Sequence, residues 1–317
     1  MHEGSFTTPI LLGPTDISIS PLGLGAWSWG DRLFWGYGLG YGEADVRAAF
    51  DASRAGGIVL FDTAEFYGMG RSERLLGQFI RTSQTPLVVA TKFFPYPWRL
   101  TGASLVPALK RSLKRLGLDR VDLYQIHWPT PPVSIEAWMQ GMADAVEQGL
   151  TRAVGVSNFS VDQTKRAHAS LADRGIPLAS NQVSFSLLDR SAEHNGLLRI
   201  CDETQITLIA YSPLAQGLLT GKYTPDNPPA GVRRFRNSRP RLAKIGPLVS
   251  LMRSIGEDHG GKTPAQVALN WVLCKGAVPI PGAKNARQAR ENVGAIGWRL
   301  TEAEVTLLDD ASDRLSR

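Results

Sequence analysis

Four polar residues of the sequence, Asp62, Tyr67, Lys92 and His127, have the chemistry of a proton-delivery site. A phenol with a pKa of about 10 is a poor acid at neutral pH, but a nearby ammonium group lowers that pKa by stabilising the phenolate. Lys92 can supply the ammonium, and Asp62 can supply the counter-charge that a buried lysine needs. His127 adds a donor or an orienting group. The set could protonate a carbonyl oxygen, and these residues alone do not decide whether Tyr67 or His127 gives the proton.

Each of these residues also has a purely structural interpretation. Asp62 and Lys92 could form only an ion pair, His127 could be a satisfied core side chain, and Tyr67 could anchor a loop. Their common position at the ends of apolar runs favours the chemical interpretation over four separate coincidences.

The elements that must position them are eight short apolar runs, typical of buried strands. They are Leu22–Leu24, Ile58–Phe61, Leu87–Ala90, Val121–Ile126, Ala153–Val156, Ala179–Val183, Thr207–Ala210 and Ala277–Ile280. Segments between them, such as 43–56 and 104–117, space apolar residues as a helix does and end at a glycine. Alternating strands and helices predict a parallel sheet, and eight units predict an α/β fold, a (β/α)8 TIM barrel, as a single domain over residues 1–317.

Polar residues stand at or just past the ends of six of these runs. They are Asp62, Lys92, His127, Asn158, Gln182 and Tyr211. Successive members lie about 24 to 35 residues apart, close to the length of one βαβ unit. We therefore expect them to meet on the C-terminal rim of the barrel, where the active sites of this fold lie.

Two segments do not fit the regular repeat. Residues 10–25, ILLGPTDISISPLGLG, alternate and turn at Gly13-Pro14, which predicts a β-hairpin across the barrel floor. The interval from Tyr211 to Pro279 is too long for one unit. It contains a loop rich in Pro, Gly and Arg at 221–241, interpreted as a lid, and an extra helix near Ile245–His259.

The bulk composition excludes several classes of protein. Apolar residues make up 43% of the 317 and charged residues 20%, which is typical of a globular chain. No apolar run is long enough for a membrane span, and the N-terminus lacks the features of a secretion signal, so a cytoplasmic protein is expected. Cys201 and Cys274 both fall in expected helices, so no disulfide is predicted. The five histidines show no metal-ligand spacing, so no metal is expected.

The formal net charge is +6, and much of the excess lies between residues 233 and 244. The basic residues there are Arg233, Arg234, Arg236, Arg239, Arg241 and Lys244. A solvated loop or attraction of an anionic, phosphorylated cofactor explains them. Nucleic-acid binding is not predicted, because the basic residues are not interleaved with exposed aromatic residues in a recognisable module. The sequence leaves open whether the protein is a monomer or a homo-oligomer.

A set of ordered motifs, taken together, resembles the aldo-keto reductase superfamily. They are "FDTAEFYG…GRSERLLG", "ATKF", "LYQIHWP", "VGVSNFS", "NQVSFSLLDR", "YSPLAQGLLTGKY" and "PIPGAKNARQARENVGAIGWRL", and they run from about Ile10 to Leu308. The resemblance implies a (β/α)8 barrel that reversibly reduces aldehydes and ketones with NADPH, or less often NADH, without a metal. It implies that Tyr67 is the general acid, that Lys92 held by Asp62 lowers its pKa, and that His127 orients the carbonyl.

The resemblance also implies the cofactor contacts. Ser157 and Asn158 would hold the carboxamide beside Gln182, and Tyr211 would stack on the nicotinamide ring. Gly25, Ala26 and Trp27 would pass close to its ribose, and the segment Ser212–Gly221 would follow the pyrophosphate. The full expected set is Gly25, Ala26, Trp27, Asp62, Ser157, Asn158, Gln182, Tyr211, Ser212, Pro213, Leu214, Gly217, Leu218, Gly221, Lys222, Pro281, Gly282, Lys284, Gln288, Glu291 and Asn292.

The segment "PGAKNARQARENVG" bears on the choice of cofactor. A lysine at 284 near the adenosine ribose suits a 2′-phosphate, and a helix N-terminus near Asn285 adds partial positive charge. Many relatives have an arginine where this chain has Gln288, and Lys284 with Arg287 or Arg290 would compensate. We predict NADPH over NADH.

Aromatic residues after the strands predict the substrate pocket. Trp29, Phe34 and Trp35 offer apolar surface beside the glycine cluster at 36–42, and Trp98 and Trp128 follow strand ends near His127. They favour hydrophobic or aromatic carbonyl substrates. The glycine cluster does not have the G-x-G-x-x-G spacing of a Rossmann site.

Two other functions stay open at this point. A Schiff-base aldolase would use Lys92 as a nucleophile on the same barrel. A cofactor-sensing regulatory subunit would bind the dinucleotide with little turnover.

Overall fold

Parallel strands in chain order form the central sheet of the computed structural model, which describes residues 5–83, 86–229 and 237–316. Within these ranges the sheet has eight strands: β3 (Leu24–Gly25), β4 (Leu60–Asp62), β5 (Val88–Phe93), β6 (Val121–Ile126), β7 (Thr151–Ser157), β8 (Leu178–Ser184), β9 (Thr207–Tyr211) and β10 (Val278–Pro279). A bridge between Gly25 and Gly282 and a hydrogen bond from the Gly23 amide to the Pro279 carbonyl bring the first and last strands together. The predicted (β/α)8 barrel is confirmed.

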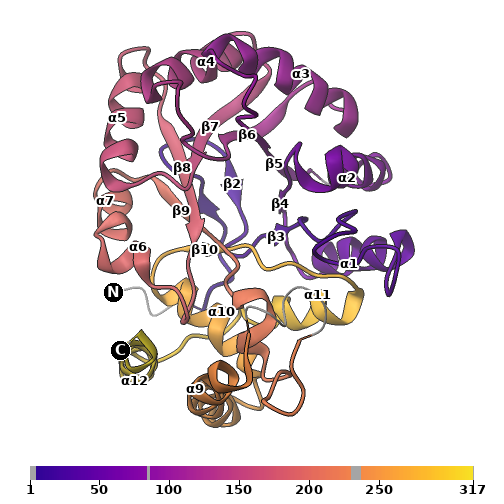
Figure 1. The fold of residues 1–317 in the computed structure, drawn as a ribbon, viewed down its shortest axis with the longest axis vertical. Helices are drawn as coiled ribbons and strands as arrows, with labels where there is room; N and C mark the ends of the chain where they lie inside the picture. The colour runs from indigo at the N-terminus through magenta and orange to yellow at the C-terminus, as the bar shows by residue number, and fades with distance from the viewer. Residues whose placement is uncertain (1–4, 84–85, 230–236, 317) are drawn as a thin grey trace.

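Helices surround the sheet (Figure 1). They are α1 (Glu43–Ala55), α2 (Arg71–Arg81), α3 (Leu105–Leu116), α4 (Ile135–Glu147), α5 (Val161–Ala172), α6 (Ser191–His194), α7 (Leu197–Glu203), α9 (Arg239–Asp258), α10 (Pro264–Cys274), α11 (Ala286–Val293) and α12 (Glu302–Ser316), with 3₁₀ turns η1 (Tyr67–Gly70), η2 (Gly102–Ser104) and η3 (Ala215–Thr220). Local sequence sets several ends. Ser160 caps α5 and Thr263 caps α10 through capping boxes, and α3 ends at Gly117, which has a left-handed φ of 69°.

The antiparallel hairpin of β1 (Ile10–Leu11) and β2 (Ser18–Ile19) closes the floor of the barrel. Its side chains Leu12, Ile17 and Ile19 are buried with residues from the interior of the strands, including Leu60 and Leu123. Gly13 is required at the turn, because its φ is +56° and a Cβ would lie 2.4 Å from the Ala179 carbonyl oxygen. The predicted position of the hairpin is confirmed.

The long insertion between β9 and β10 begins its extra helix earlier than predicted, and part of this insertion lies outside the described residues. Helix α9 begins at Arg239 rather than near Ile245, because Ser238 and the following Arg-Pro form a good helix start. Residues 230–236 lie outside the described residues, so the lid and the roles of Arg233, Arg234 and Arg236 stay predictions.

The two cysteines lie in α7 and α10, as expected, and both are free thiols. Burial raises the pKa of Cys201 to about 12, which makes it unreactive. Across the described ranges, no group of three or more potential ligands could hold a metal ion. In the same part of the chain, no helix has the length and apolarity that crossing a bilayer requires.

Candidate active site

The C-terminal rim brings together the four residues with proton chemistry. Asp62 is the last residue of β4, Lys92 lies near the end of β5, and His127 directly follows β6. Asp62 pairs in register with Ala90 and Lys92 with Gln125, so Lys92 stands two residues beyond the partner of Asp62, and His127 two residues beyond the partner of Lys92. Tyr67 reaches the same point from η1, just after β4.

Lys92 is fully buried and its charge is compensated. Its Nζ donates to the Asp62 carboxylate and, at 2.9 Å, to the Thr63 carbonyl. The other carboxylate oxygen of Asp62 accepts hydrogen bonds from Gln182 at 2.9 Å and Gln125 at 3.2 Å. Burial lowers the pKa of Lys92, against the opposing effect of Asp62. The amides and the ion pair fix the ammonium in one place.

The Tyr67 hydroxyl lies 3.5 Å from Lys92 Nζ. Burial, with the Asp62 carboxylate in second place, raises the pKa of Tyr67 well above 10. The net shift of this pKa is upward because burial disfavours the phenolate, and the lowering contribution expected from Lys92 stays a prediction. Tyr67 holds its proton at neutral pH, and Lys92 is close enough to stabilise the phenolate once the proton has left.

His127 is neutral in this site. Burial and the nearby Lys92 charge lower its pKa well below 6.5. Its Nδ1 is buried and has no hydrogen-bond partner among the described residues. The tautomer that carries the proton on Nε2 avoids burying an unsatisfied donor, so we assign that tautomer. The imidazole can then donate a hydrogen bond into the pocket that it lines.

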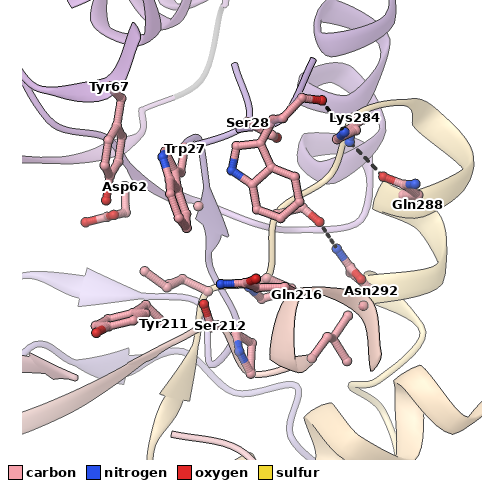
Figure 2. Close-up of a pocket in the computed structure, with 18 of the residues that line it drawn as sticks. Trp27, Ser28, Asp62, Tyr67, Tyr211, Ser212, Gln216, Lys284, Gln288 and Asn292 are labelled. Carbon is pink, nitrogen blue, oxygen red and sulfur yellow. Dashed lines mark hydrogen bonds between the residues drawn. The ribbon is translucent and has the colours of Figure 1, made fainter. Parts of the chain in front are cut away.

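A cavity of about 600 Å³ runs from these residues to α11. Figure 2 shows Tyr67 and Asp62 at one end, Lys284, Gln288 and Asn292 at the other, and Trp27 and Ser28 between them. The expected cofactor residues that line it are Gly25, Trp27, Asp62, Ser157, Asn158, Gln182, Tyr211, Ser212, Pro213, Leu214, Gly217, Lys222, Pro281, Gly282, Lys284, Gln288, Glu291 and Asn292. Ala26, Leu218 and Gly221 lie outside the lining; Ala26 and Leu218 are in the core, at 0% and 5% exposure, and Gly221 ends η3 with a φ of 77°.

The backbone beside the cavity has an unusual conformation. Ser212, Ala215 and Gln216 have left-handed φ angles of 51°, 46° and 56°, and Gly217 follows at 95°. Strained residues of this kind gather at functional sites, and alternating helical and left-handed residues form backbone pockets for anions. Gln216 was not named individually from the sequence, although it lies inside the segment Ser212–Gly221 that was expected to follow the pyrophosphate. The left-handed backbone conformation of a glutamine cannot be predicted from the residue type.

The far end of the cavity is built by α11 and the loop before it. Asn285 accepts a hydrogen bond from the Gln288 amide at 3.0 Å, and the Gln288 side chain accepts one from the Lys284 amide at 2.9 Å. The Lys284 ammonium donates to the Trp35 carbonyl at 2.8 Å and lies 4.3 Å from the centre of the Tyr41 ring. Lys284 thus joins this end of the cleft to the loop after β3.

These residues fit a phosphorylated dinucleotide. Among the residues that the structure describes, three cationic side chains, Lys222, Lys284 and Arg287, line the cavity. Ser28, which sequence reasoning also missed, lines it too, and its Oγ is buried with no hydrogen-bond partner in the described part of the chain. A buried hydroxyl without a partner is costly, and a ligand oxygen would satisfy it.

Aromatic rings line the end of the cavity near Tyr67. They are Trp27, Phe66, Phe94 and Trp128, and two of them, Phe66 and Phe94, were not predicted. Trp35 lines the cavity beside Lys284, whose ammonium lies 5.0 Å from the centre of its ring. Phe34 is outside the lining but stacks on Trp27 with ring centres 5.0 Å apart.

The predictions that Trp29 and Trp98 line the substrate pocket are wrong. Trp29 is 0% exposed, donates from its indole to the Ala283 carbonyl at 2.9 Å and packs on Phe79, so it belongs to the core. Trp98 is 73% exposed and stacks on Tyr96 outside the cavity lining. Position after a strand does not fix the direction of a side chain.

A closed barrel with a buried Lys–Asp pair, a tyrosine and a neutral histidine at one end of a long cleft defines a barrel oxidoreductase. The chain belongs to the Aldo/keto reductase family, whose model matches residues 21–313. Members of this family act on small-molecule carbonyls and use nicotinamide cofactors.

Relatives are similar over nearly the whole chain. It is 45% identical to the chloroplastic pyridoxal reductase of Arabidopsis thaliana, over 96% of this chain and 85% of that protein. It is 30% identical to the NADH-specific methylglyoxal reductase of Escherichia coli, over 97% and 99%. The solved structure of a glycerol dehydrogenase from Gluconobacter oxydans superposes with a TM-score of 0.85 at 28% identity, over 97% and 96%.

Proposed function

We propose that this chain, as a single catalytic domain, reduces aldehydes and ketones to alcohols with NADPH, reversibly, and that Tyr67 is the general acid. One observation carries the proposal: the Tyr67 hydroxyl lies 3.5 Å from the buried Lys92 ammonium and beside His127, at one end of a cavity of about 600 Å³ that extends to α11.

Each residue then has one task. His127 and the Tyr67 hydroxyl orient the carbonyl oxygen by hydrogen bonding. A nicotinamide cofactor, when bound, would supply hydride to the carbonyl carbon. Tyr67 would give its proton to the carbonyl oxygen, so that an alcohol would form. Lys92 stabilises the remaining phenolate, and Asp62 with its two glutamine partners holds Lys92 in place. In the reverse direction the phenolate accepts the proton.

Preference for NADPH over NADH is supported by charge. Lys222, Lys284 and Arg287 line the cleft, and the N-terminus of α11 lies there as well. The relatives do not decide the matter, because one of them is named as NADH-specific. Measuring KM for both cofactors tests the preference, and equal values or a lower value for NADH would reject it.

Pyridoxal is the first substrate to test. The plant relative is named a pyridoxal reductase, and the aromatic walls of the cavity suit a flat heteroaromatic aldehyde. Methylglyoxal, from the name of the bacterial relative, is the small aliphatic comparison. A cytoplasmic location stays a prediction, since the plant relative is chloroplastic.

The two other functions have less support. Lys92 is 0% exposed and bonded to Asp62 and Thr63, so an aldolase nucleophile is not supported. A cofactor sensor would bind NADPH and fail to oxidise it in the presence of carbonyl compounds.

The Tyr67→Phe variant tests the mechanism. We expect kcat to fall by about 10²- to 10⁴-fold, the usual contribution of a general acid, while the affinity for NADPH, measured by fluorescence titration, is unchanged. A variant that keeps more than about a tenth of the wild-type rate would show that Tyr67 is not the donor.

A further inference from the structure

We propose that Glu65 and Arg99 are a pair of positioning residues that set the carbonyl-binding end of the cavity; this rests on the proposed function. Both side chains carry charge, and each residue is only 8% exposed. Arg99 holds Glu65 with both terminal nitrogens, one to each carboxylate oxygen, the second at 2.9 Å. Such a two-pronged pair fixes orientation as well as distance.

The pair forms hydrogen bonds with both backbone polar groups of Phe94. The Phe94 amide donates to Glu65 at 2.7 Å, and Arg99 donates to the Phe94 carbonyl at 2.6 Å. The guanidinium also lies 4.5 Å from the centre of the Phe93 ring and 5.0 Å from that of Tyr96. The start of the loop after β5 is therefore held at one point by charge, hydrogen bonds and ring contacts.

Phe94 connects the ion pair to the end of the cavity that contains Tyr67 and His127. Its ring stacks on Phe66 with centres 4.4 Å apart and meets His127 edge-on at 5.6 Å. Tyr67 meets the same imidazole edge-on at 5.7 Å. Glu65 lies two residues before Tyr67 in the chain, so one ion pair fixes the pocket wall, the orienting histidine and the approach to the general acid.

Stability alone is a poor reason for this pair. Buried ion pairs give little net stability relative to apolar residues, because desolvation offsets their attraction. A second pair in the same barrel, Arg115 with the fully buried Glu73, provides the comparison. Glu73 also accepts from Thr91, and none of these three residues lines the cavity.

The test compares Arg99→Met with Arg115→Met, each of which leaves a buried carboxylate without its arginine. For Arg99→Met we expect KM for pyridoxal to rise about 10- to 100-fold, because small misplacements near the reacting atoms have effects of this size. We expect the NADPH dissociation constant to stay within about twofold. Hydrogen exchange at the Phe94 amide should become faster. Arg115→Met should lower the melting temperature similarly and leave KM unchanged.

Two further variants keep the test decisive if Arg99→Met does not fold. Arg99→Lys keeps the charge and loses the two-pronged contact, and Glu65→Gln keeps an acceptor for the Phe94 amide. Both should raise KM by less than Arg99→Met does.

Unchanged KM in folded Arg99 variants, or an equal rise of KM in Arg115→Met, would overturn the positioning role while the proposed function stands. A wild-type protein that oxidises no NADPH with pyridoxal, methylglyoxal or aromatic aldehydes would overturn both.

Discussion

The two ends of the same eight strands differ in what they bury. At the C-terminal rim the strands end in Asp62, Lys92 and Gln182, which are buried polar groups held by mutual hydrogen bonds. At the floor they meet Leu12, Ile17 and Ile19 of the hairpin, which are buried apolar groups held by packing. Burying charged groups at the rim costs free energy of folding. Burial of apolar side chains at the floor contributes free energy that offsets this cost. Substitutions at the rim should therefore change kcat or KM, whereas those at the floor should change only the free energy of unfolding.

The largest effect is expected for Lys92→Met at the rim. Removal of the ammonium leaves Asp62 uncompensated, so the free energy of unfolding should fall by about 3–5 kcal/mol. The rate kcat should fall by at least about 10²-fold, because nothing stabilises the phenolate. Urea unfolding and steady-state kinetics measure the two quantities.

The double variant Lys92→Met/Asp62→Asn is the control for that experiment. With both charges removed, much of the stability should return and the rate should not. Recovery of the rate would mean that the ion pair acts only in folding.

At the floor, Leu12→Ala should show the opposite pattern. Loss of a fully buried leucine should lower the free energy of unfolding by about 2–5 kcal/mol and leave kcat and KM unchanged. Leu11→Ala, in the same hairpin but 59% exposed, is the matched control and should change the stability little. A large change of kcat in Leu12→Ala would show that the two ends are coupled.

A smaller effect is expected for Lys284→Gln at the cofactor end of the rim. A hydrogen bond to a charged group contributes about 1.5–3 kcal/mol, so KM for NADPH should rise at least about tenfold. KM for NADH should rise less, since NADH lacks the 2′-phosphate and only the lost link to the Trp35 carbonyl affects it. A parallel rise for both cofactors would mean that Lys284 acts only by holding the loop at Trp35.

The smallest effect concerns pH. The pKa of His127 is lowered well below 6.5 and that of Tyr67 is raised well above 10, so neither group titrates near neutrality. We expect kcat/KM for reduction to be level between about pH 6.5 and 10 and to fall only at higher pH, where Tyr67 loses its proton. A transition between about pH 6 and 7 would show that His127 is charged during turnover.

The strands and the rim could be predicted from the sequence because both depend on local pattern. Eight apolar runs of strand length, with Asp62, Lys92 and His127 at their ends, place these residues side by side once the sheet is parallel. The hairpin followed from alternation and a Gly-Pro turn.

Other features depend on the direction of side chains and on burial, which a one-dimensional pattern does not contain. Trp29 and Trp128 both follow strands, yet the first packs in the core and the second is 44% exposed at the pocket. The raised pKa of Tyr67 depends on depth in the folded protein. The pair of Glu65 and Arg99 joins two loops across 34 positions with no periodic signal.

The double attachment of Lys284 bears on protein engineering. An attempt to switch the nucleotide requirement by replacing this lysine would also remove the link to the Trp35 carbonyl and the Tyr41 ring. A redesigned variant would therefore need a second substitution that re-anchors the tryptophan-bearing segment. Libraries that randomise positions 35, 41 and 284 together should outperform scans of single sites.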